Sequence, residues 1–89
     1  MNPGREQETK VKPFTLYGTS ACHLCELAHS MIMEHGLASG CFALEERDIS
    51  ESDALFDRYG LRIPVLRHPD GRELNWPFSA SELAGFLAS

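Results

Sequence analysis

The sequence predicts a single α/β domain in which a mixed four-stranded sheet carries helices on both faces, in the order β-α-β-α-β-β-α. The length of 89 residues suits one domain. A β-rich run at 14–17, a helical pattern after it and a second β-rich run predict a βαβ crossover. Two further runs, 65–67 and 72–74, flank Pro69-Asp70-Gly71 and predict an antiparallel hairpin, because proline presets the first turn angle and glycine accepts a positive φ.

The first strand and the first helix are predicted on either side of a short loop. The strand ends at Gly18, and Thr19 or Ser20 can cap the helix that follows. Apolar residues then recur at the i, i+3, i+4, i+7 and i+8 positions of one helical face: Leu24, Leu27, Ala28, Met31 and Ile32. Gly36 is expected to end this helix, with His35 just before it at the negative end of the helix dipole.

The second strand is predicted over residues 41–49, where an apolar start leads into a charged stretch. A short helix should follow, because Ser50 and Asp53 resemble a capping box and Gly60 can close the helix. The apolar face expected for this helix consists of Leu55, Phe56 and Tyr59.

The third strand is expected to begin near Pro64, at a position where a missing N–H is tolerated. After the hairpin, Ser79 and Glu82 form a capping box at the start of a last helix. The apolar face expected for that helix consists of Leu83, Phe86 and Leu87.

The composition limits the classes of partner. Asp and Glu number 13 against 8 Lys and Arg, so the formal net charge is −5. Nucleic-acid binding needs clustered cations, and a membrane span needs about 18 apolar residues in a row, so neither partner is expected. Residues 1–12 are polar and aperiodic, and we expect a flexible tail before a domain at 13–89. The tail has no apolar signal segment and the cysteines number 3, which favours a cytoplasmic location.

Cys22 and Cys25 carry the predicted chemistry. Residues three apart in the first turn of a helix lie on one face, close enough to form a reversible disulfide. Cys22 lies where unpaired N–H groups and the positive end of the helix dipole stabilise a thiolate, which is the reactive form of cysteine. Cys25 should lie further inward and attack the mixed disulfide formed on Cys22. We therefore predict Cys22 as the nucleophile and Cys25 as the resolving cysteine.

Zinc sites use the same C-x-x-C spacing, but zinc normally takes four ligands. The other candidate ligands contain no second metal-ligand pair: Cys41, His23, His29, His35 and His68. No metal site is therefore predicted, and Cys41 is expected to be an inert, buried apolar residue. Two alternatives remain open: a metal or iron–sulfur module that binds through Cys22, and a non-enzymatic interaction domain with an inert C-x-x-C.

The strand, the motif Thr19-Ser20-Ala21-Cys22-His23-Leu24-Cys25, the helix and the later segment Arg62-Ile63-Pro64-Val65-Leu66 together resemble the thioredoxin superfold. The closest resemblance is to small bacterial glutaredoxin-like proteins, over about residues 14–88. It implies a thioredoxin-like fold and a thiol–disulfide oxidoreductase that serves cell redox homeostasis. It also implies a cis proline beside the C-x-x-C at Pro64, which would leave the backbone of Ile63 available to a peptide or thiol substrate.

The sequence departs from glutaredoxins at two places that concern the substrate. His23 and Leu24 stand between the cysteines where glutaredoxins have proline and an aromatic residue, and a cationic His23 would stabilise the Cys22 thiolate. Asn75-Trp76-Pro77-Phe78 occupies the place of the Gly-Gly pair of glutathione-binding members. Arg62 is a further candidate contact, for a substrate carboxylate.

The expected substrate is therefore a disulfide in a protein or a glutathione mixed disulfide. No bound cofactor is expected, and glutathione is a candidate co-substrate. The protein is expected to act as a monomer.

Overall fold

The computed structural model describes residues 13–39 and 43–88. The expected tail at 1–12 and the role assigned to Cys41 lie outside these residues. The described elements are β1 (Phe14–Gly18), α2 (His23–Ser39), β2 (Leu44–Asp48), a 3₁₀ turn η1 (Ile49–Glu51), α3 (Asp53–Tyr59), β3 (Val65–Arg67), β4 (Glu73–Asn75) and α4 (Ala80–Ala88). Their order confirms the α/β fold class and the predicted sequence of strands and helices.

The four strands form one mixed sheet in the order β2-β1-β3-β4. β1 pairs with β2 in parallel and with β3 antiparallel, and β3 pairs antiparallel with β4. The β1–β3 register places Tyr17 opposite Val65. Continued by one residue, it places Gly18 opposite Pro64. The central position of β1 thus brings the end of this strand beside the segment that leads into β3.

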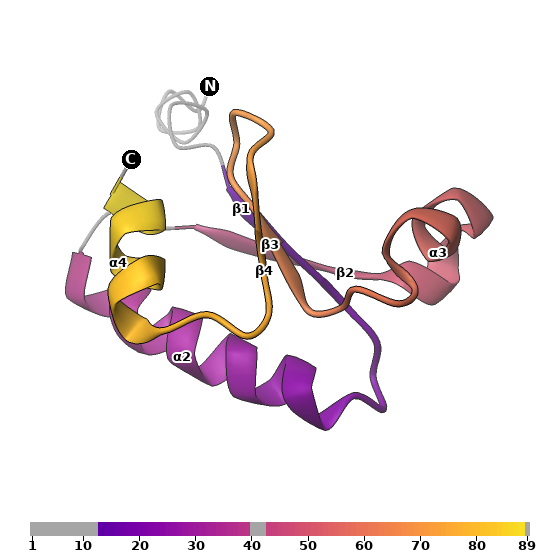
Figure 1. Ribbon diagram of the computed structural model, residues 1–89, viewed down its shortest axis with the longest axis horizontal. Helices are drawn as coiled ribbons and strands as arrows, with labels where there is room; N and C mark the ends of the chain where they lie inside the picture. Colours follow the sequence, from indigo (N-terminus) through magenta and orange to yellow (C-terminus); the bar gives the residue numbers. More distant parts are fainter. Residues whose placement is uncertain (1–12, 40–42, 89) are drawn as a thin grey trace, which may run out of the picture.

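The sheet has a separate apolar cluster on each face, because successive residues of a strand point to opposite faces. Figure 1 shows α2 and α4 together on one side of the sheet and α3 near the far end of β2. The buried cluster beneath α2 and α4 contains Phe14, Leu16, Ala28, Ile32, Leu66, Phe78 and Leu83. The cluster on the other face contains Tyr17, Ile49, Tyr59 and Val65, and the rings of Tyr17 and Tyr59 stack 4.1 Å apart.

Helix α2 differs from the prediction at both ends. It begins at His23, so neither Thr19 nor Ser20 is its cap. It also continues through Gly36 to Ser39. A glycine inside a helix costs about 1 kcal/mol relative to alanine. Burying a face that includes the fully buried Ala28 and Ile32 outweighs that cost, because hydrophobic burial of one large side chain contributes about 1.5–3 kcal/mol.

The start of α3 is also displaced from the prediction. Ile49 belongs to the 3₁₀ turn, and Ser50 donates its N–H and its hydroxyl to Asp48 Oδ1, at 2.9 and 2.7 Å. Ser52 takes the capping role instead, because its Oγ accepts the N–H of Leu55 at 3.3 Å. Phe56, expected on the apolar face of this helix, is 58% exposed.

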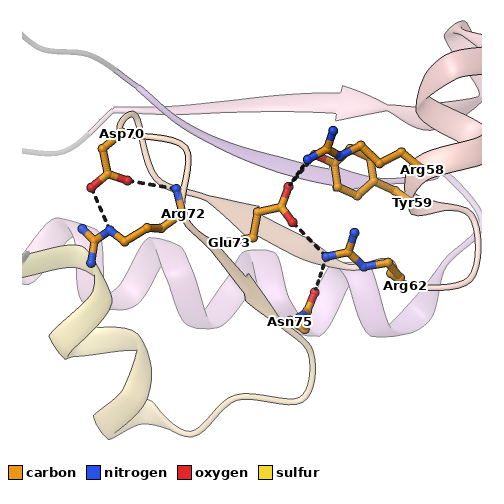
Figure 2. Close-up of polar contacts among 7 residues, drawn as sticks. All are labelled: Arg58, Tyr59, Arg62, Asp70, Arg72, Glu73 and Asn75. Atoms are coloured by element: carbon orange, nitrogen blue, oxygen red, sulfur yellow. Dashed lines mark hydrogen bonds and ion pairs between the residues drawn. The ribbon is translucent and has the colours of Figure 1, made fainter.

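The hairpin and the last helix follow the predicted local chemistry. Strand β4 begins one residue later than expected, and Gly71 has a φ of +102° in the turn. Asp70 closes this turn by accepting the backbone N–H of Arg72 at 2.9 Å and its Nε at 2.7 Å, as Figure 2 shows. At α4 the Ser79 N–H donates to Glu82 Oε1 at 2.8 Å, and the Glu82 N–H donates to Ser79 Oγ at 3.0 Å. The second capping box is therefore confirmed.

Candidate redox site

Cys22 and Cys25 form a disulfide at the start of α2, with their Cα atoms 5.2 Å apart. Cys22 precedes the first residue of the helix and is half-buried, whereas Cys25 is 7% exposed. A substrate approaching from solvent therefore meets Cys22 first.

Cys22 also caps α2. Its carbonyl accepts the N–H of Glu26 at 3.2 Å, which is the first hydrogen bond of the helix, and its Sγ accepts the N–H of Cys25 at 3.2 Å. A sulfur that accepts an N–H at the positive end of a helix is held where negative charge is stabilised. The capping interaction that the sequence assigned to Thr19 or Ser20 is thus made by the candidate nucleophile.

Gly18 is a site residue that sequence reasoning interpreted only as the end of a strand. A Cβ at this position would lie 2.8 Å from Cys25 Sγ, so only glycine lets the strand approach the sulfur this closely. The signal in the sequence was a glycine at a strand end shortly before two cysteines. Because the sheet register places Pro64 opposite Gly18, the structure brings Pro64 to the same end of the sheet as the disulfide.

The Ile63–Pro64 peptide bond is cis, and the backbone around it is held at both sides. The Ile63 N–H donates to the Tyr59 carbonyl at 3.1 Å, and the Pro64 carbonyl accepts the Trp76 N–H at 3.2 Å. Within residues 13–39 and 43–88, the N–H of Ile63 has a backbone partner and its carbonyl has none, whereas the sequence had left both groups open.

A family model described as a glutaredoxin-like domain (DUF836) matches residues 14–88. The chain belongs to this glutaredoxin-like family. The X-ray structure of target protein XcR50 from X. campestris is 41% identical, with a TM-score of 0.74 over 84% of this chain and 95% of that chain. Its solution structure is 42% identical, with a TM-score of 0.72 over 86% and 94%. The solution structure of protein Ne2328 from Nitrosomonas europaea is 27% identical, with a TM-score of 0.68 over 84% and 89%. No curated protein matches the chain significantly.

Arg62 of this glutaredoxin-like chain has partners within the protein. Its Nη2 donates to Glu73 Oε1 at 2.8 Å and to Asn75 Oδ1 at 3.0 Å. Glu73 Oε2 also accepts the Tyr59 hydroxyl at 2.6 Å and lies 3.7 Å from Arg58 Nη2. Figure 2 shows Arg58, Tyr59 and Arg62 converging on Glu73 from the end of α3 and the segment after it. The network ties that segment to β4.

The same contacts shift the pKa values of Tyr59 and Glu73. Burial, reinforced by the hydrogen bond to Glu73, raises the pKa of Tyr59 to about 12. The hydrogen bond from Tyr59, together with the bond and the positive charge of Arg62, lowers the pKa of Glu73 below its ordinary value. At neutral pH Glu73 is therefore an anion and Tyr59 a neutral donor, which is the pairing that the geometry requires.

The residues between the cysteines face outward. His23 has a 78% exposed side chain, and its described contact places Nδ1 3.6 Å from Glu26 Oε1. Leu24 is 47% exposed. The part of the chain that the structure describes thus shows His23 beside a carboxylate, and stabilisation of a Cys22 thiolate by His23 stays a prediction.

In the stretch 75–78, which replaces the Gly-Gly pair, Trp76 and Phe78 pack against the core, whereas Asn75 and Pro77 are exposed. Phe78 is 4% exposed, and Trp76 packs against the same cluster with its ring edge-to-face to Phe78 at 5.1 Å. The Trp76–Pro77 bond is cis as well, a feature absent from the sequence prediction. Both rings therefore contribute to packing.

Residues 13–39 and 43–88 contain neither a cluster of metal-ligating side chains nor a membrane-spanning helix. No group of three or more His, Cys, Asp or Glu side chains there could hold a metal ion. No helix there is long and apolar enough to cross a membrane.

Proposed function

We propose that the protein is a dithiol thiol–disulfide oxidoreductase that acts on disulfides of proteins or on mixed disulfides. The observation that carries this proposal is the Cys22–Cys25 pair at the start of α2, with the Cys22 sulfur accepting the Cys25 N–H. The greater accessibility of the half-buried Cys22 and the burial of Cys25 support their assignment as nucleophile and resolving cysteine.

The reaction begins when the Cys22 thiolate attacks one sulfur of a substrate disulfide. A Cys22–substrate disulfide forms, the substrate S–S bond breaks, and the leaving thiolate takes a proton from solvent. Cys25 then loses its proton to solvent and attacks Cys22 Sγ. The second substrate thiolate leaves with the electron pair, and Cys22 and Cys25 become a disulfide. The substrate gains two electrons, which the dithiol loses, and no resident cofactor takes part.

A thiol reductant must return the pair to the dithiol state. Two molecules of glutathione or one dithiol protein have the required chemistry. The first thiol attacks the Cys22–Cys25 disulfide and forms a mixed disulfide, and the second thiol attacks that bond and leaves as glutathione disulfide or as the disulfide of the dithiol protein. Ile63 would line the approach to Cys22 and offer its carbonyl to a substrate N–H, and the fully buried Pro64 would hold this backbone in place. For Arg62, the bonds to Glu73 and Asn75 support a role in holding this approach in place.

Reduction of insulin and of a glutathione–peptide mixed disulfide tests the proposal with three proteins. The wild type should turn over at least one of the two substrates when supplied with glutathione or a dithiol reductant. Cys22→Ser should abolish exchange, because the attacking sulfur is gone. Cys25→Ser should accumulate a mixed disulfide with the substrate, visible by mass spectrometry as a covalent adduct.

Two results would overturn the proposal. One is the absence of exchange by the wild type with both substrates and both reductants. The other is a biological activity that Cys22→Ser leaves intact, which would favour an interaction domain. Stoichiometric iron or zinc in the purified protein, lost in Cys22→Ser, would favour the metal module instead.

A further inference from the structure

A hollow of about 460 Å³ opens beside Cys25, between the first turns of α2 and the end of β2. Gly18 and Thr19 line it at the end of β1, and Cys25 is part of its wall. The hollow therefore adjoins the disulfide, at the edge where the parallel strands β1 and β2 end. Ligands of α/β sheets bind preferentially at this edge.

The charged groups that line the hollow are mainly acidic. They comprise four carboxylates and one guanidinium, with one histidine: Glu26, Glu46, Asp48, Glu51, Arg47 and His29. Arg47 lies 3.6 Å from Glu45 Oε2 and 3.9 Å from Glu51 Oε1, so carboxylates already neighbour its charge. His29 Nε2 lies 3.1 Å from Glu46 Oε2. The wall opposite Cys25 thus presents an excess of negative charge.

We infer that this hollow selects the substrates of the redox site by charge, favouring disulfides flanked by lysine or arginine over anionic ones. The inference rests on the proposed function and names its substrate class. An extended peptide advances about 3.3 Å per residue, so we expect the side chains next to a cysteine bound to Cys22 to extend toward the hollow that Cys25 lines. Complementary charge also raises the rate of encounter, and like charge lowers it.

Mixed disulfides of glutathione belong to the anionic substrates that the hollow should disfavour. At neutral pH the tripeptide carries two carboxylates and one ammonium group, so its mixed disulfides bring net negative charge to an acidic wall. The stretch 75–78 adds to this, because Trp76 and Phe78 pack into the core at the place of the Gly-Gly pair. The preferred substrate is therefore a cationic protein disulfide.

Two peptides of equal length test the inference. Each carries one cysteine joined by a disulfide to 2-mercaptoethanol, flanked by lysines in one peptide and by glutamates in the other. The full-length protein is reduced, freed of reductant and mixed in excess with each peptide. Released peptide thiol is measured after acid quenching. The rate ratio between the peptides cancels the intrinsic reactivity of Cys22, because the same protein acts on both.

The lysine peptide should react about tenfold faster than the glutamate peptide at about 20 mM salt. The ratio should approach one at about 0.5 M salt, because the Debye length falls from about 20 Å to about 4 Å. Glu46→Gln and Glu51→Gln should each lower the low-salt ratio about twofold to fivefold, the range for exposed ion pairs. Glu34→Gln is the matched control: Glu34 is exposed on α2 outside the hollow, so it removes the same charge elsewhere.

The outcomes separate the two proposals. Equal rates for both peptides at low salt would overturn the charge selection and leave the redox function standing. The charge selection would also be overturned if Glu34→Gln lowered the rate ratio as much as Glu46→Gln does. The net charge of the protein, and not the charge of the hollow, would then set the ratio. No reaction with either peptide would remove the redox function, and the substrate inference with it.

Discussion

Replacing Glu73 by glutamine removes the charge at the centre of the network that fastens the segment after α3 to β4. The Glu73 side chain is 15% exposed, and its carboxylate accepts the Tyr59 hydroxyl at 2.6 Å and Arg62 Nη2 at 2.8 Å. Glutamine keeps the shape and one acceptor oxygen. It forfeits one of these two bonds and the attraction to Arg58 at 3.7 Å.

The expected loss follows from the burial of each partner. Tyr59 is 1% exposed, so its bond to a carboxylate belongs to the class that contributes about 1.5–3 kcal/mol. Arg62 is 38% exposed and contributes at most about 1 kcal/mol. Glu73→Gln should therefore lower the free energy of unfolding by about 2 kcal/mol, measured by urea denaturation of the reduced protein at pH 7. A loss below about 0.5 kcal/mol would refute this account of the network.

The contribution of this network to the free energy of unfolding should depend on pH. The folded-state pKa of Glu73 is lowered, so its contribution is present above the ordinary carboxyl pKa of 4.5 and is lost as the pH falls through the folded value. The gap between wild type and Glu73→Gln should therefore close in acid. The pKa of Tyr59 is raised from 10.0 to about 12, so its contribution is complete below pH 10 and is lost as the pH rises toward 12. Tyr59→Phe should flatten this alkaline limb, and a limb unchanged in that variant would contradict the assignment.

Three further variants probe other parts of the structure. Ile32→Ala removes most of a fully buried side chain of α2 and should lower the free energy of unfolding, measured in urea, by about 2–5 kcal/mol. A loss under about 1 kcal/mol would mean that neighbouring side chains move in to fill the cavity. Ser79→Ala breaks the capping box of α4 and should cost about 0.5–2 kcal/mol, seen as a lower thermal midpoint with unchanged exchange rates. Gly18→Ala places a Cβ 2.8 Å from Cys25 Sγ and should slow resolution of the Cys22 mixed disulfide about tenfold to hundredfold in quenched single turnovers. An unchanged rate would show that Cys25 does not react from this position.

Local chemistry was the part of the fold that the sequence predicted well. The capping box of Ser79 and Glu82 and the turn closed by Gly71 involve residues within four positions of each other, so their geometry depends little on the rest of the chain. The start of α2 was mispredicted although it is also local. Serine and threonine are preferred residues at helix N-caps, so the capping propensities favoured Thr19 or Ser20 over Cys22.

Contacts between distant segments could not be predicted in the same way. Nothing near Glu73 in the sequence marks it as the partner of Tyr59 and Arg62, because the fold alone brings β4 beneath the end of α3. Arg62 was therefore interpreted as a substrate contact from its place before Pro64. The hollow beside Cys25 depends likewise on the side-by-side pairing of β1 and β2, which sets Glu46 near the start of α2.

The central strand explains why the redox site arises at this one place. β1 pairs with β2 on one side and β3 on the other, so its last residue, Gly18, has an acidic strand end to one side and Pro64 to the other. Only residues 19–22 separate that point from α2, which places the capped end of the helix, and with it Cys25, against Gly18. The candidate nucleophile, the proposed substrate approach and the acidic wall therefore share one origin in the sheet order. A change in the length of the 19–22 loop should disturb all three together, whereas changes in the 68–72 hairpin turn should leave them intact.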